Sequence, residues 1–136
     1  FIEMKYGDGA LTGSSGIMGH ITSLHGYLSV PQKLQNLKQE IINVFNQKID
    51  LGLIDNKNKI KGFNNEKPEF IFVFANHDPG STKLRNELHK AVDWGNVTVP
   101  QNFTIKAATS NFMGYGLYMP CVYTLPNFIA NFGSTI

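Results

Sequence analysis

The feature that most constrains the fold is an unbroken run of strand-forming residues, EFIFVFA, at positions 69–75. A strand that is apolar on both faces is typical of the centre of a sheet that is covered by helices. The polar residues 76–81 follow the run directly and predict its end. This segment therefore favours a layered α/β domain.

Residue patterns elsewhere predict the remaining elements. Alternation with period two indicates a strand, and apolar residues at helical spacing indicate helices. Asp78 is a candidate N-cap for the helix that follows the apolar run. The expected elements are a strand at 1–6, a glycine-rich loop at 7–16, helices at 17–28 and 31–51, a strand at 69–75, a helix through 84–92, a strand at 103–108, and one or two short strands or irregular segments within 115–136.

This order of strands and helices predicts a single α/β domain over residues 1–136, with a mixed, partly parallel central sheet flanked by helices. The length and the 42% of hydrophobic residues suffice for one compact core. No apolar run approaches the roughly 20 residues that span a bilayer, so we expect no membrane partner. The single cysteine, Cys121, cannot form a disulfide within the chain, which makes a cytoplasmic location the expectation. The net charge of +2 neither indicates nor excludes a nucleic-acid partner.

A charged pair near the start of the chain is the strongest candidate for chemistry. Residues i and i+2 of a strand point to the same face, so Glu3 and Lys5 are expected to project together. A carboxylate is a hard ligand that suits Mg²⁺, which needs only one or two protein carboxylates. A neighbouring ammonium can orient a water molecule or stabilise negative charge as it develops on a phosphate. The pair therefore suits the hydrolysis of a phosphodiester.

The stretch Phe1-Ile2-Glu3-Met4-Lys5, followed by a loop and a helix, resembles the PD-(D/E)XK nuclease superfamily, which includes restriction enzymes and repair nucleases. The motif is Glu3-Met4-Lys5, and the compatible order of elements extends over residues 1–92. The resemblance implies a restriction-endonuclease-like fold and a Mg²⁺-dependent endonuclease, a hydrolase that acts on DNA. It further implies that Glu3 is a metal ligand and that Lys5 is the catalytic lysine.

The chain departs from the family pattern in one respect. The family places an acidic residue on the strand or turn before the Glu-x-Lys strand, whereas only Phe1 and Ile2 precede Glu3 here. We therefore expect that the first elements of the fold lie upstream of Phe1, or that a second chain supplies the acidic ligand, as in a homodimer.

Additional residues are candidates for the same site. The glycine-rich loop fits neither phosphate-binding glycine motif, but Gly9, Ser14 and Ser15 could lie beside a nucleic-acid backbone. His20, near the start of the following helix, could face Glu3. His77 follows the buried strand, and ligands bind beyond the carboxyl ends of parallel strands.

Two alternatives compete with a nuclease. In the first, the chain is a non-catalytic interaction or ligand-binding module, in which Glu3 and Lys5 are surface charges on a strand. In the second, serine, histidine and aspartate form a hydrolytic triad, but the sequence contains no G-x-S-x-G elbow.

Overall fold

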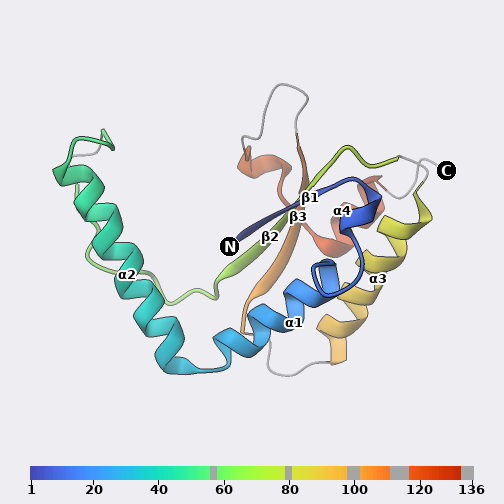
Figure 1. Ribbon diagram of the computed structural model, residues 1–136, viewed down its shortest axis with the longest axis horizontal. Coiled ribbons are helices and arrows are strands. Elements are labelled where there is room, and N and C mark those ends of the chain that lie inside the picture. Colours follow the sequence, from blue (N-terminus) through green and yellow to red (C-terminus); the bar gives the residue numbers. More distant parts are fainter. Residues whose placement is uncertain (56–57, 79–80, 98–101, 111–116, 133–136) are drawn as a thin grey trace. The chain divides into compact units, whose positions relative to one another are not determined.

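The computed structural model describes residues 1–55, 58–78, 81–97, 102–110 and 117–132. These residues contain an open four-stranded sheet with the order β1 (Ile2–Tyr6), β2 (Glu69–Ala75), β3 (Thr104–Thr109) and β4 (Tyr123–Thr124) (Figure 1). The pairs β1–β2 and β2–β3 are parallel, and β4 runs antiparallel to β3. The prediction of an α/β architecture with a mixed, partly parallel sheet is confirmed.

The run at 69–75 forms the central strand. Six of the seven residues of β2 are buried, from Phe70 to Ala75. Since neighbouring residues of a strand point to opposite faces, this strand is apolar and buried on both faces, as its sequence predicts.

The α-helices of the described residues are α1 (Ile17–Leu28), α2 (Pro31–Asp50), α3 (Thr82–Val97) and α4 (Leu125–Phe132). Short 3₁₀ helices span Asp8–Ala10 and Met119–Cys121. The first two helices and the strands β1 to β3 match the predicted ranges within two residues. None of the helices in the described parts of the chain is long and apolar enough to cross a membrane.

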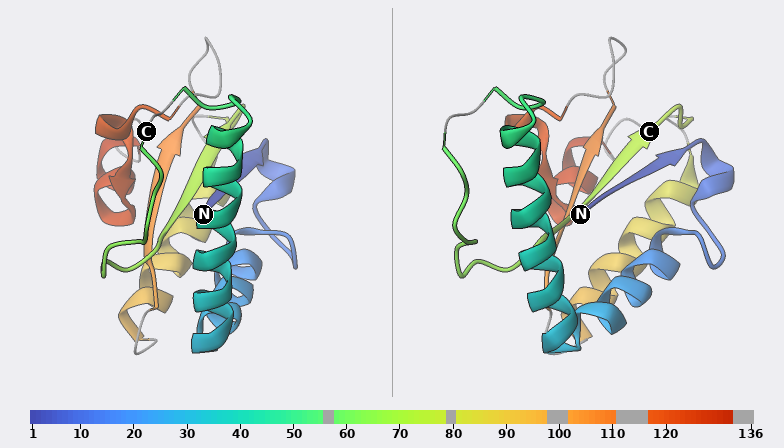
Figure 2. Two further views of the ribbon diagram at one scale, coloured as in Figure 1. Left: turned by 90° about the vertical axis from the view of Figure 1, so that its left-hand side faces the viewer. Right: turned by 60° about the vertical axis from the view of Figure 1, so that its left-hand side comes forward.

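The chain divides into two compact units, which we describe separately. The first comprises residues 1–25 and 67–136 and contains the sheet, α3 and α4; the second comprises residues 26–66 and contains α2. In the first unit, aromatic rings join the helices to the sheet: the ring of Phe128 on α4 lies 5.6 Å from that of Phe74 on β2. Figure 2 shows α1 and α3 running side by side, and the ring of His25 meets that of Trp94 edge-on at 5.3 Å.

In the second unit, α2 is amphipathic but buries none of its residues. Its Asn46 side chain donates to the Ile60 carbonyl oxygen at 2.8 Å and accepts from the Ile60 amide at 2.9 Å, which attaches the following segment to the helix. Gly52 adopts a φ of 68°, the left-handed conformation in which a helix commonly ends.

One local expectation was right only in part and another was wrong: the short strand expected within 115–136 is present as β4, but it does not account for the residues after Thr124. Residues 125–132 form the helix α4 and not a strand or an irregular segment, because Pro126 lies in the first turn, where a proline costs no hydrogen bond. The helix α3 begins at Thr82, and Ser81 caps it: the amide of Leu84 donates to Ser81 Oγ at 3.4 Å. Asp78 is therefore not the N-cap residue.

Candidate active site

Glu3 and Lys5 lie on one face of β1 and contact each other, as the strand geometry predicts. The Lys5 Nζ donates to Glu3 Oε1 at 3.0 Å and to the Ser15 carbonyl oxygen at 2.5 Å. Lys5 is only 2% exposed, whereas the side chain of Glu3 is 30% exposed. A buried ammonium must be compensated by acceptors, and these two oxygens provide the compensation. Lys5 is thus not a surface charge, contrary to the alternative expectation.

His20 belongs to the same cluster. Its Nε2 lies 3.2 Å from Glu3 Oε1, and its side chain is 34% exposed. Both contacts of Glu3 use Oε1, and Oε2 makes no hydrogen bond or ion pair within the described parts of the chain. The cluster of Glu3, Lys5 and His20, hereafter the Glu3 cluster, therefore combines a buried cation with a carboxylate that solvent can reach.

The glycine-rich loop positions Ser15 over Lys5 because it folds tightly against the start of α1. A Cβ atom on Gly16 would lie 2.5 Å from the Leu11 carbonyl oxygen, and one on Gly19 would lie well inside contact distance of the Ser14 carbonyl oxygen. Leu11 is fully buried, so its side chain attaches the loop to the hydrophobic core. Only glycine permits this approach of the two backbones.

The other predicted loop residues lie at the surface, and of these the backbone of Ser15 contacts the cluster. Gly9 lies in the 3₁₀ helix Asp8–Ala10, and Ser14 and Ser15 follow in the loop; all three residues are exposed.

His77 lies beside β1, as expected if β1 and β2 run parallel. Its Nε2 is 3.0 Å from the Lys5 carbonyl oxygen, and its Nδ1 is 2.9 Å from Asp8 Oδ1. The Ser81 hydroxyl donates to Asp8 Oδ2. Both ring nitrogens of His77 face oxygen atoms, which fixes the orientation of the ring.

The hydrogen bonds at Asp8 change its titration. The Ser81 hydroxyl, and then the His77 ring, hold the pKa of the Asp8 carboxyl below its usual value of 3.8. These three residue types also occur in hydrolytic triads, but here the serine hydroxyl donates to the aspartate and not to the histidine. The cluster of Asp8, His77 and Ser81 therefore does not activate a serine nucleophile.

The Glu3 cluster can hold a magnesium ion only if waters and substrate phosphates supply most of its ligands. Within the described parts of the chain, no three histidine, cysteine, aspartate or glutamate side chains are grouped to hold a metal. Magnesium, however, keeps several waters and often binds through one or two carboxylates and the phosphates of its substrate. Glu3 can supply one such ligand through Oε2.

Sequence patterns did not reveal the roles of Asp8 and Ser81. The signal that could have found them is topological: Asp8 follows the carboxyl end of one strand, and Ser81 follows that of the neighbouring parallel strand. Such residues meet at one edge of the sheet.

No protein-family model matches the sequence, and searches of curated proteins and of solved structures likewise gave no match.

Proposed function

We propose that the Glu3 cluster is the active site, or part of the active site, of a Mg²⁺-dependent endonuclease of the restriction or repair type that hydrolyses DNA. The observation that carries the proposal is the contact, at 3.0 Å, of the buried Lys5 ammonium with the partly exposed Glu3 carboxylate. Burying a lysine is costly, and the chain holds this one with two acceptors beside an accessible carboxylate. The proposed fold is of the PD-(D/E)XK type.

In this proposal each residue has a distinct part. Glu3 Oε2 would hold the cation, which would lower the pKa of a water ligand and offset phosphate charge. The Ser15 carbonyl holds the Lys5 ammonium in place, so that it stabilises the negative charge that develops on the phosphate. Hydrolysis forms a bond from the water oxygen to phosphorus, breaks the bond to the leaving oxygen, and transfers the water proton to that oxygen.

The loop between β1 and α1 suits a nucleic-acid substrate. Gly9, Ser14 and Ser15 are exposed within the 13 residues that separate Glu3 from Ile17, the first residue of α1. Amide and hydroxyl groups of such residues bind phosphate oxygens without regard to base sequence.

The experiment is cleavage of supercoiled plasmid DNA by the full-length protein. We expect nicking with Mg²⁺ and none with a chelator. Glu3→Gln keeps the shape of the side chain but removes the metal ligand, and Lys5→Met removes the ammonium. Each variant should lose about 100-fold or more in rate, the size of effect seen when one group that stabilises the transition state is removed.

Lys61→Met is the matched control, because it makes the same chemical change at an exposed lysine in the other unit. It should cleave at the wild-type rate. Thermal unfolding of each variant shows whether the fold survives. Equal cleavage by the wild type, Glu3→Gln and Lys5→Met would overturn the proposal. Intact plasmid with the wild-type protein would favour the non-catalytic alternative.

A further inference from the structure

A cavity in the first unit borders the Glu3 cluster at His77, whose Nε2 lies 3.0 Å from the Lys5 carbonyl oxygen. Its volume is about 360 Å³, within the range of about 300–1,000 Å³ that is usual for small-molecule sites. Its walls come from the carboxyl ends of β2 and β3, from the first half of α3 and from α4. None of Glu3, Lys5 and His20 lines it. The carboxyl edge of parallel strands is the usual location of ligands in such sheets.

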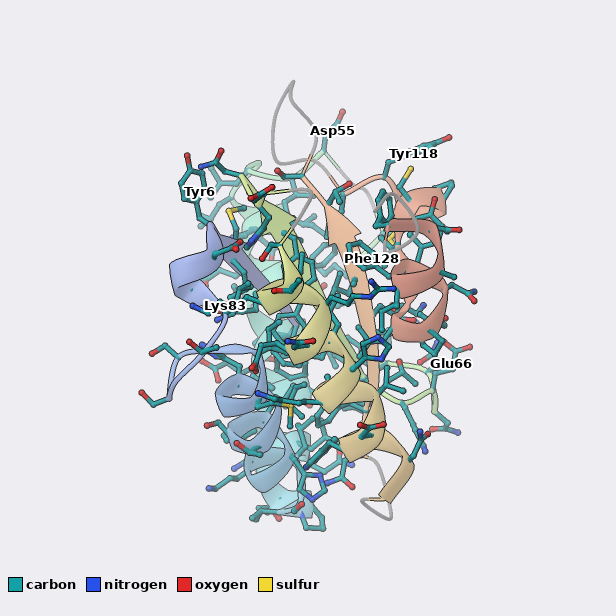
Figure 3. The ribbon with its side chains drawn as sticks, turned by 90° about the vertical axis from the view of Figure 1, so that its right-hand side faces the viewer. Tyr6, Asp55, Glu66, Lys83, Tyr118 and Phe128 are labelled. Carbon is teal, nitrogen blue, oxygen red and sulfur yellow. The ribbon has the colours of Figure 1, made fainter. Side chains whose placement is uncertain are left out.

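One wall of this cavity is aromatic. Phe74 of β2, Phe128 and Phe132 form a chain of ring contacts, with centroids 5.6 Å apart in the first pair and 4.7 Å apart in the second. Phe128, which Figure 3 labels where α4 faces the rest of the unit, is almost fully buried, whereas Phe132 is 46% exposed. An exposed ring beside two buried ones leaves an apolar surface on which a flat ligand can pack.

The charges around the cavity favour an anion of single charge. Arg85 lines it from α3 and makes no ion pair with any residue that the structure describes. Arginine offers a planar fork that pairs with both oxygens of a carboxylate. Asp78 also lines the cavity, and its carboxyl group disfavours a ligand with two negative charges.

We propose that this cavity binds a small aromatic carboxylate. The ring packs against the exposed ring of Phe132, beside the buried Phe128, and the carboxylate pairs with the Arg85 guanidinium. Thr109 and Ser110 at the end of β3 line the same cavity, and their hydroxyl groups are available as hydrogen-bonding partners. The proposal does not rest on the proposed nuclease activity: none of Glu3, Lys5 and His20 lines the cavity, and among the described residues the two sites meet only at His77, whose Nε2 lies 3.0 Å from the Lys5 carbonyl oxygen.

The test uses indole-3-acetate as the probe and its neutral analogue indole-3-acetamide as the comparison, with binding followed by chemical shifts of backbone amides. A ligand of this size should bind with a Kd of about 1 mM or tighter. Shifts should map to α3, α4 and the end of β2. Indole-3-acetamide should bind about 10-fold more weakly, because it lacks the charged partner of Arg85.

Two variants make the test specific. Arg85→Gln should weaken indole-3-acetate binding about 10-fold and leave indole-3-acetamide unchanged, whereas Lys83→Gln, which removes a positive charge from the same helix, should change neither. Ile129→Trp places a large side chain on the lining and should abolish binding of both.

Four results would overturn the proposal. The first is equal affinity for the acid and the amide, and the second is an equal loss in Arg85→Gln and Lys83→Gln. The third is a set of amide chemical-shift changes confined to the apolar residues of α2, which belongs to the other unit. The fourth is tighter binding of adenosine 5′-monophosphate than of indole-3-acetate, which would assign the cavity to a phosphate ligand.

Discussion

At the scale of single residues, two short networks connect β1 to the rest of the first unit. The Lys5 ammonium donates to the Glu3 carboxylate and to the Ser15 carbonyl oxygen. The backbone carbonyl oxygen of Lys5 lies 3.0 Å from Nε2 of His77. The same-face placement of Glu3 and Lys5 could be predicted, because it follows from strand geometry alone. The burial of Lys5 could not, since it depends on how residues 11–16 fold over the strand.

Asp8 gives a prediction about pH. Its pKa is lowered in the folded protein, so its contribution to stability is present above the unfolded value of 3.8 and is lost as the pH falls through the folded value. Asp8→Asn should therefore lower the free energy of unfolding at pH 7 by less than about 1 kcal/mol, because the Asp8 side chain is 35% exposed and solvent screens its charge. The difference from wild type should shrink below about pH 4, as measured by urea unfolding between pH 3 and pH 7.

Asp55→Asn is the control for this prediction, because Asp55 is an exposed carboxylate in the other unit. It should leave the unfolding free energy near the wild-type value across the same range. If Asp8→Asn lowers the free energy of unfolding by the same amount at every pH down to 3, the charge of Asp8 is not the stabilising feature.

At the scale of elements, the start of α1 depends on the close approach of the glycine loop. The amide of Ile17 donates to the Leu11 carbonyl at 3.0 Å, and the amide of His20 donates to the Gly16 carbonyl at 3.1 Å. This arrangement places the Ser15 carbonyl oxygen beside the Lys5 ammonium and the His20 ring beside the Glu3 carboxylate. A loop could be predicted from its glycines, but not its compact form, because glycine permits many conformations and tertiary contacts select one.

Gly19 and Gly26 provide a matched pair of substitutions on α1. Gly19→Ala should lower the free energy of unfolding by about 2 kcal/mol or more, because the new Cβ would clash with the backbone of Ser14. Gly26→Ala should raise it by about 0.5–1 kcal/mol, since a Cβ there meets nothing within 4 Å and alanine favours the helix. Chemical denaturation measures both, and equal effects of the two substitutions would contradict the close approach.

At the scale of the whole molecule, the parallel pairing of β1 with β2 brings residues far apart in the sequence to one edge of the sheet. Asp8 and His77 are 69 positions apart yet lie in contact. The buried run at 69–75 made this pairing predictable in outline. The cavity was not predictable, because one of its walls is α4, and Pro126 in the first turn of α4 suggested a break where a helix begins.

The central claim, that Glu3 binds a divalent cation beside Lys5, is tested most directly by titrating Mn²⁺ into the ¹⁵N-labelled full-length protein. Manganese replaces magnesium at oxygen sites and broadens amide signals only near the ion. We predict selective broadening at Lys5, Ser15 and His20, lost in Glu3→Gln and retained in Lys61→Met. Broadening centred on the acidic residues of the second unit, or broadening around Lys5 that persists unchanged in Glu3→Gln, would contradict the claim.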